Sequence, residues 1–156
     1  MCVAAALNDI GTETSQTEAL NYIEKAFDIK QDYAGAHFMK GNILRELNQL
    51  DQAAVSFQKT IQYSSTLEYK PDVLYLGLVN LGALLMHGTL TNVSHFGPSL
   101  HQTKQAKHAF EEALVLKPKR YAPNANLAEV LSILIGAGQI GVHWDDVVKY
   151  YDIASK

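Results

Sequence analysis

The sequence predicts an all-α fold made of about four antiparallel helical hairpins. Residues recur at a spacing of 34: Ala19 returns as Ala53, and each alanine is followed four positions later by a large apolar residue, Ile23 or Phe57. Apolar residues around them repeat every three or four positions, the period of a helix with one buried face. A repeat of this length is a pair of helices that buries its apolar face by packing on its neighbours.

A small residue in the first helix of each hairpin locates two insertions in the repeat. Gly41 and Gly82 are 41 residues apart, seven more than one period, which places an insertion around residues 63–72. Gly82 and Ala128 are 46 apart, twelve more than one period. We place those twelve in residues 88–100, because this stretch is rich in the Gly, Ser, Thr, Asn and Pro that are typical of a loop.

The resulting map is a single domain over residues 1–156. Its hairpins cover 1–30, 34–66, 72–116 with the inserted loop 88–100, and 122–155. We expect first helices over 2–11, 34–47, 72–87 and 122–136, and second helices over 16–29, 50–66, 102–116 and 144–155.

Two stretches carry a pattern in which small residues allow helices to approach and an aromatic ring fills the space between them. One stretch has Gly41, Ala53, Phe57 and Thr60, and the other has Gly82, Ala106, Phe110, Ala113 and Pro118. In these residues the chain resembles the tetratricopeptide repeat family. The resemblance implies a right-handed superhelical α-solenoid, and a protein-interaction scaffold or adaptor that binds an extended peptide or helix of a partner in its concave groove. It implies no catalytic residues and no cofactor.

In that family the first helices line the groove, and asparagines there bind the backbone of the ligand. A carboxamide suits this role because it both donates and accepts hydrogen bonds. The groove residues expected here are Asn8, Phe38, Met39, Asn42, Arg45, Val79, Asn80, Ala83, Met86, Asn126 and Glu129. The positions where chaperone-tail adaptors of the family carry basic residues hold Phe38, Ala122 and Asn126. We therefore expect a hydrophobic peptide or helix rather than a terminal carboxylate.

Composition excludes several other classes. The chain is 47% hydrophobic and 19% charged, with a net charge of −3, so it lacks the basic excess of nucleic-acid binders. We see neither a membrane span nor a signal peptide, and expect a cytoplasmic protein. The lone Cys2 forms no intrachain disulfide, and the spacing of His95, His101 and His108 does not predict a metal site.

One alternative stays open. Gly136, Gly138 and Gly141 match the GxGxxG pattern of dinucleotide-binding proteins, which would make the chain an enzyme or part of one. Only 15 residues follow Gly141, and the preceding segment is rich in helix formers. We therefore interpret the glycines as the end of a helix and a turn before Asp145, which we expect to cap the next helix.

The last helix has apolar residues on more than one side. Val147, Val148 and Ile153 stand beside Tyr150 and Tyr151. A single packing face needs fewer. We therefore expect the chain to self-associate through this helix, with Tyr150 or Tyr151 in the contact.

Overall fold

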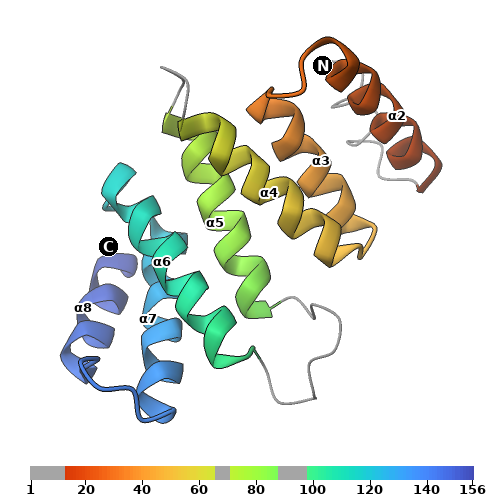
Figure 1. The fold of residues 1–156 in the computed structure, drawn as a ribbon. Helices are drawn as coiled ribbons and strands as arrows, with labels where there is room; N and C mark the ends of the chain where they lie inside the picture. The colour runs from red at the N-terminus through yellow and green to blue at the C-terminus, as the bar shows by residue number, and fades with distance from the viewer. Residues whose placement is uncertain (1–12, 66–70, 88–97) are drawn as a thin grey trace. The chain divides into compact units, whose positions relative to one another are not determined.

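A computed structural model describes residues 13–65, 71–87 and 98–156, and within these ranges it consists of α-helices joined by short turns (Figure 1). The helices are α2 (Glu13–Ile29), α3 (Ala34–Glu46), α4 (Leu50–Ser65), α5 (Pro71–His87), α6 (Leu100–Leu116), α7 (Tyr121–Gly136) and α8 (Trp144–Ala154). The predicted all-α class is confirmed.

The predicted helix boundaries agree closely with these helices. Most ends lie within two residues of their predicted positions, and the largest difference is the start of α2, at Glu13 instead of residue 16. The first predicted helix, over 2–11, lies outside the described residues, as does most of the predicted loop 88–100.

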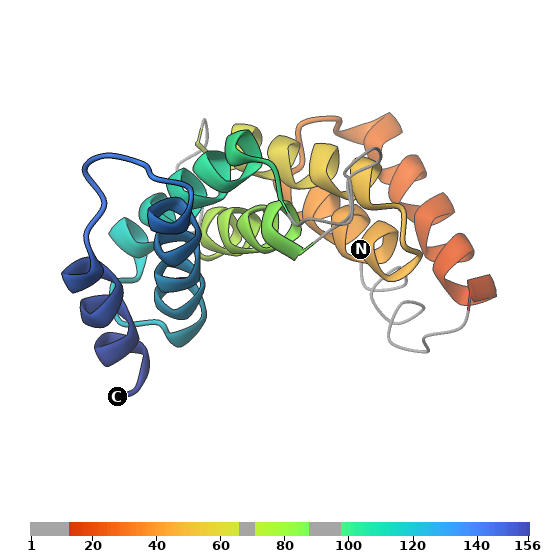
Figure 2. The same cartoon turned by 90° about the horizontal axis from the view of Figure 1, so that it is seen from below.

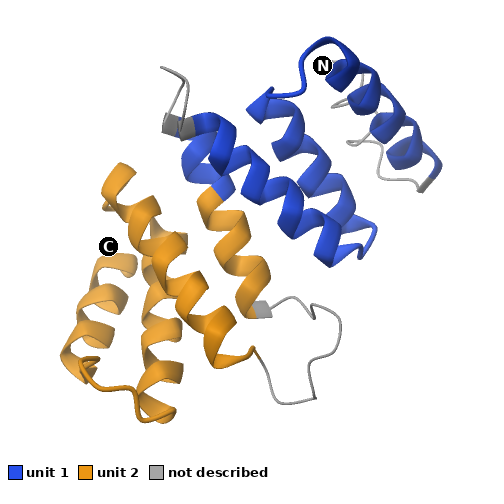
Figure 3. Ribbon diagram, viewed as in Figure 1, with its two compact units in different colours: residues 1–77 blue, residues 78–156 orange. Residues whose placement is uncertain are grey.

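The chain divides into two compact units, one ending at Gly77 and the other beginning at Leu78 (Figure 3). In unit 1, α3 packs against both α2 and α4; in unit 2, α7 packs against both α6 and α8 (Figure 2). Unit 1 therefore contains the α3–α4 hairpin together with α2, and unit 2 contains the α7–α8 hairpin together with α6. The boundary between the units falls within α5. That all 156 residues form a single domain stays a prediction.

Both units have the close helix approach that the repeat pattern predicts. A Cβ atom on Gly41 would lie 2.6 Å from the ring of Phe57, and one on Gly82 would lie 2.7 Å from the ring of Phe110. Both rings are fully buried, at 0% exposure. A side chain at either glycine would therefore push into a closely packed aromatic ring.

Helices α3 and α7 end in the same hydrogen-bonded turn. Asn48 (φ 58°) and Gly138 (φ 70°) each have left-handed backbone just past their helix. Asn48 N donates to Arg45 O, and the next amide, Gln49 N, donates to Leu44 O; the turn at Gly138 repeats this pair of bonds. This pattern binds carbonyl groups that the end of a helix leaves without partners.

The structure corrects one local prediction and accounts for the glycine motif. The residue that caps α8 is His143, with extended backbone, and not Asp145, which lies in the first turn of the helix. The carboxylate still lies near the positive end of the helix dipole there.

Helix α7 precedes the GxGxxG pattern, whereas the dinucleotide fingerprint requires a strand in that position. Gly138 and Gly141 instead supply positive φ to a turn.

Helix α6 starts with a reciprocal pair of hydrogen bonds. The Ser99 hydroxyl accepts from Gln102 N at 3.2 Å, and the Gln102 side chain accepts from Ser99 N at 2.9 Å. This capping box satisfies two amides at once, so the start of α6 is specified by its own residues.

Candidate functional site

In unit 1 the predicted groove residues fall on one face of α3. Phe38, Asn42 and Arg45 are spaced four and three residues apart, so they share a side of the helix. Phe38 and Asn42 are partly exposed and Arg45 is exposed. The Phe38 ring lies 6.0 Å from the Phe57 ring, which anchors it to the core. Met39 is different, because it packs against the core cluster around Ile23 and Ile43.

In unit 2 the predicted residues lie on α5 and α7. Val79, Asn80 and Ala83 on α5 are partly exposed. Asn126 and Glu129 on α7 are also partly exposed. The side chain of Met86 is only 5% exposed, so it belongs to the packed interior rather than to a ligand-binding surface. Asn8, the remaining predicted residue, lies outside the described part of the chain.

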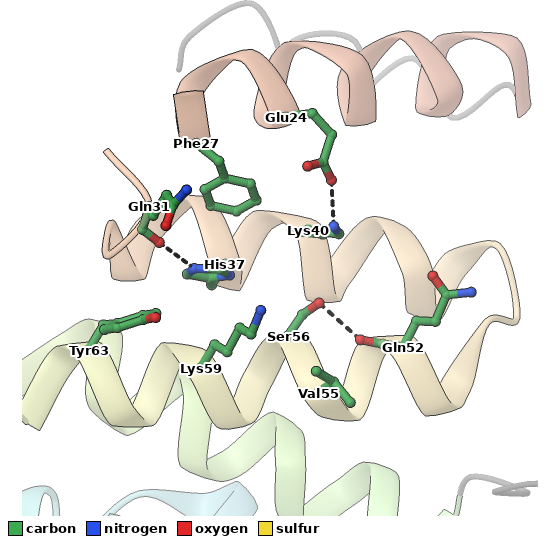
Figure 4. A pocket seen from close by; sticks show the side chains of 10 residues that line it. All are labelled: Glu24, Phe27, Gln31, His37, Lys40, Gln52, Val55, Ser56, Lys59 and Tyr63. Carbon is green, nitrogen blue, oxygen red and sulfur yellow. Dashed lines mark hydrogen bonds and ion pairs between the residues drawn. The ribbon is translucent and has the colours of Figure 1, made fainter. Parts of the chain in front are cut away.

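Unit 1 also has a pocket of about 460 Å³ on another side of α3 (Figure 4). Its floor is formed by His37 and Lys40 of α3, one wall by α2 and the other by α4. At about 100° per residue, His37 and Lys40 point about 100–160° away from Phe38 and Asn42 around the helix. The pocket is therefore distinct from the predicted groove surface.

His37 lies between two aromatic rings at one end of this pocket. Its ring centroid is 4.3 Å from that of Phe27 and 5.2 Å from that of Tyr63, both in stacked geometry. Its Nε2 is 2.8 Å from the carbonyl oxygen of Gln31, to which the neutral ring donates. Burial lowers the pKa of His37 below its ordinary value of 6.5, and the neighbouring Lys59 acts in the same direction. The imidazole is accordingly neutral at pH 7.

Lysines supply the positive charge of the pocket. Lys40 forms an ion pair with Glu24 of α2, and its ammonium lies 5.7 Å from the centre of the Phe27 ring. Lys59 projects from α4 into the pocket (Figure 4). Glu24 is the one carboxylate in the lining, so the lining carries a net charge of +1 when His37 is neutral.

The repeat pattern did not predict this pocket, although the sequence contains one indication that His37 is buried. His37 stands four residues before Gly41, and the polar Asn124 stands four residues before Ala128. A polar residue at this offset in two hairpins marks a buried position with a specific partner. Lys59 gave no such signal, because a lysine on a helix is ordinarily solvated.

Neither a metal-binding cluster nor a membrane-spanning helix is found among the described residues. No group of three or more His, Cys, Asp or Glu side chains is placed to hold a metal ion there. Of the three histidines whose spacing does not predict a metal site, His95 lies outside these ranges, and His108 approaches Glu112 at 3.3 Å. None of the described helices combines the length and apolar character that a membrane crossing requires.

Comparison with known proteins identifies the repeat. Residues 34–66, which include α3 and α4, match the model of the tetratricopeptide repeat. No curated protein sequence matches the chain significantly. A solved structure described as the functional characterization of Pseudomonas aeruginosa PilF has a TM-score of 0.70 to this chain at 21% sequence identity. That match covers 97% of this chain and 58% of the PilF chain, so the chain spans less than two thirds of the PilF length.

At this identity, the likeness to PilF shows the fold alone. The repeat match covers the hairpin that carries Gly41 and Phe57. The same glycine–phenylalanine contact recurs at Gly82 and Phe110 in unit 2. The chain is therefore an all-α protein of helical hairpins, and its residues 34–66 match the tetratricopeptide repeat.

Proposed function

We propose that this protein is an interaction scaffold that binds an extended peptide or a helix of a partner protein on the exposed face of its first helices. Tetratricopeptide repeats generally mediate contacts between proteins. The observation that carries the proposal is the face of α3 formed by Phe38, Asn42 and Arg45. It presents an anchored aromatic ring, a carboxamide and a cation on the surface of the α3–α4 hairpin.

These three groups suit a peptide ligand. A carboxamide serves peptide N–H and C=O groups whatever the side chains of the ligand are. Phe38 offers an apolar contact, and its packing on Phe57 keeps the entropic cost of binding low. The partly exposed Asn126 of α7 provides a second carboxamide in unit 2.

Selection of peptides from a random display library, followed by affinity measurements, tests this function. We expect Asn42→Ala to weaken a selected peptide by about 1–3 kcal/mol, because polar groups of the peptide lose their partner. Gln58→Ala is the matched control, since Gln58 is an exposed amide on α4. Peptides whose affinity is unchanged by Asn42→Ala and by Phe38→Ala would contradict the proposed surface.

An enzymatic role is the rival function. A thermal-shift screen with nicotinamide and flavin cofactors separates the two, because a genuine cofactor site would raise the melting temperature by mass action. We expect no shift, because the glycine motif follows a helix.

We also propose that copies of the chain associate through α8. One side of this helix exposes Trp144 (60%), Val148 (65%) and Tyr151 (49%), spaced four and three residues apart. Val147, which borders this row and is 4% exposed, packs the helix into unit 2. A row of large apolar side chains at helical spacing is typical of a surface that packs against another helix. Of the two predicted tyrosines, Tyr151 is the more exposed one.

A further inference from the structure

We propose that the pocket between α2 and α4 binds a single acidic side chain of a partner protein. This site is separate from the proposed peptide-binding face, because its lining includes none of Phe38, Asn42 and Arg45, which point to another side of α3. The argument depends on the charge, the size and the walls of the pocket, all within unit 1.

The charges of the lining favour one carboxylate. The Lys40–Glu24 ion pair compensates one lysine, which leaves the charge of Lys59 uncompensated within the lining. An ammonium group has three N–H donors and no acceptor, so a carboxylate is its natural ligand. A carboxylate that enters beside Lys59 makes the pocket neutral.

The same charges disfavour a phosphate group. A phosphate ester carries about −1.5 to −2 charges at neutral pH. Glu24 lies in the same lining and would repel the excess negative charge. His37 supplies no compensating positive charge, since it is neutral and donates its Nε2 proton to Gln31 O.

The walls and the volume fit a side chain that has an aliphatic stem. Val55, 51% exposed, and the ring of Phe27 provide apolar contacts beside the lysines. The Ser56 hydroxyl already donates to the Gln52 carbonyl at 2.9 Å, so it meets the ligand as an acceptor only. A volume of about 460 Å³ lies at the lower end of the range of protein binding pockets, about 300–1,000 Å³. It is ample for a glutamate side chain, and the polar lining does not suit a large apolar group.

The experiment is a titration of the ¹⁵N-labelled full chain, followed by NMR. The probes are a capped tetraglutamate peptide, a capped tetraglutamine peptide and a capped tetrapeptide that contains one phosphoserine. We expect tetraglutamate to shift the amide signals of His37, Lys40 and Lys59, and tetraglutamine to leave them unchanged. The absence of shifts with tetraglutamate at millimolar concentration would overturn the proposal.

Variants establish whether the binding belongs to the pocket. Lys59→Gln removes the uncompensated charge and should raise the Kd for tetraglutamate about fivefold. Lys104→Gln removes one charge from an exposed position on α6 and should change the Kd less than twofold. Equal effects of the two variants would show that only the overall charge matters and would overturn the site. Tighter binding of the phosphoserine peptide than of tetraglutamate would also overturn it. Circular dichroism of each variant confirms that the helices are intact, which is expected because both lysines are exposed.

Discussion

The side chains of His37 and Asn124 each bind the carbonyl group six residues earlier, in the turn that leads into their helix. His37 Nε2 lies 2.8 Å from Gln31 O, and Asn124 Nδ2 donates to Pro118 O at 2.9 Å. Asn124 also donates to Arg120 O at 2.7 Å. Both residues are buried and occupy the fourth position of a first helix, α3 or α7. Two hairpins therefore use the same position to tie a turn to the helix that follows it.

Asn124→Asp tests this tie in unit 2. The substitution preserves shape but replaces the donating amide by a carboxylate oxygen, which would face two carbonyl oxygens. We expect the free energy of unfolding to fall by about 1–3 kcal/mol, measured by urea denaturation. Asn126→Asp adds the same charge at a partly exposed position of the same helix and should have a much smaller effect. Equal losses in both variants would show that charge, and not the lost donor, is responsible.

His37 makes stability depend on pH in a defined direction. Its folded-state pKa is lowered, first by burial and then by Lys59 and Lys40, whereas the Gln31 carbonyl and Glu24 act in the opposite sense. The unfolded state therefore binds the proton more readily, so the contribution is complete above pH 6.5 and is lost as the pH falls toward the folded-state pKa. We expect the difference in unfolding free energy between wild type and His37→Gln to shrink from pH 7.5 to pH 5.5. A constant difference across this range would contradict it.

The contact between Gly41 and Phe57 predicts an unusual cost for an alanine in a helix. Alanine in place of glycine ordinarily stabilises a helix by about 1 kcal/mol. At Gly41 the added methyl group meets a fully buried ring, and overpacking costs about 1–3 kcal/mol. We therefore expect a net loss of about 1 kcal/mol in thermal or urea unfolding. Gly136→Ala is the control, since nothing lies within 4 Å of its Cβ position, and it should be neutral or stabilising.

The left-handed residues that follow α3 and α7 predict that alanine lowers the free energy of unfolding at this position and that glycine does not. Gly138→Ala places a Cβ atom in left-handed backbone and should cost about 1 kcal/mol. Asn48→Gly relieves a similar strain and should be neutral or stabilise by less than 1 kcal/mol, roughly. Urea denaturation of both variants measures this. A stabilising Gly138→Ala would show that the turn adopts another conformation in solution.

Tyr151→Glu tests self-association through α8. The wild-type chain should gain apparent mass with concentration in light scattering, and Tyr151→Glu should abolish the gain, because a buried unpaired carboxylate opposes the contact. Tyr121→Glu is a suitable control, since Tyr121 is 69% exposed but lies on α7. A wild-type chain that is monomeric at every concentration would exclude the contact.

The helix boundaries and the closest helix contact could be predicted from the sequence, because both depend on residues at short and regular spacing. The 34-residue spacing and the glycine and proline positions gave the helices nearly to the residue, and the small-residue slot anticipated the contact of Gly41 with Phe57. The prediction of Asp145 as the cap of α8 is wrong, because a favourable residue type does not by itself determine which residue has the extended backbone of a cap. That residue is His143. The offset of Met86 in the repeat predicts a place in the groove. That offset does not report how deeply neighbouring helices bury the side chain, which is 5% exposed.

The pocket depends on information of a different kind. Glu24, Lys40 and Lys59 come from three helices, and the distance between any two of them along the chain says nothing about their proximity. Their meeting depends on the packing of α3 against α2 and α4 and on the reach of long side chains.

The capping box at Ser99 has a practical consequence for protein engineering. Because Ser99 and Gln102 satisfy each other's backbone amides, the first turn of α6 carries its own starting signal. The start of α6, and so the position of Phe110 along this helix, therefore does not depend on the residues directly before Ser99. A fluorescent reporter or an affinity tag spliced in immediately before Pro98 would leave this starting signal intact, and would label the protein outside the two proposed binding surfaces of unit 1.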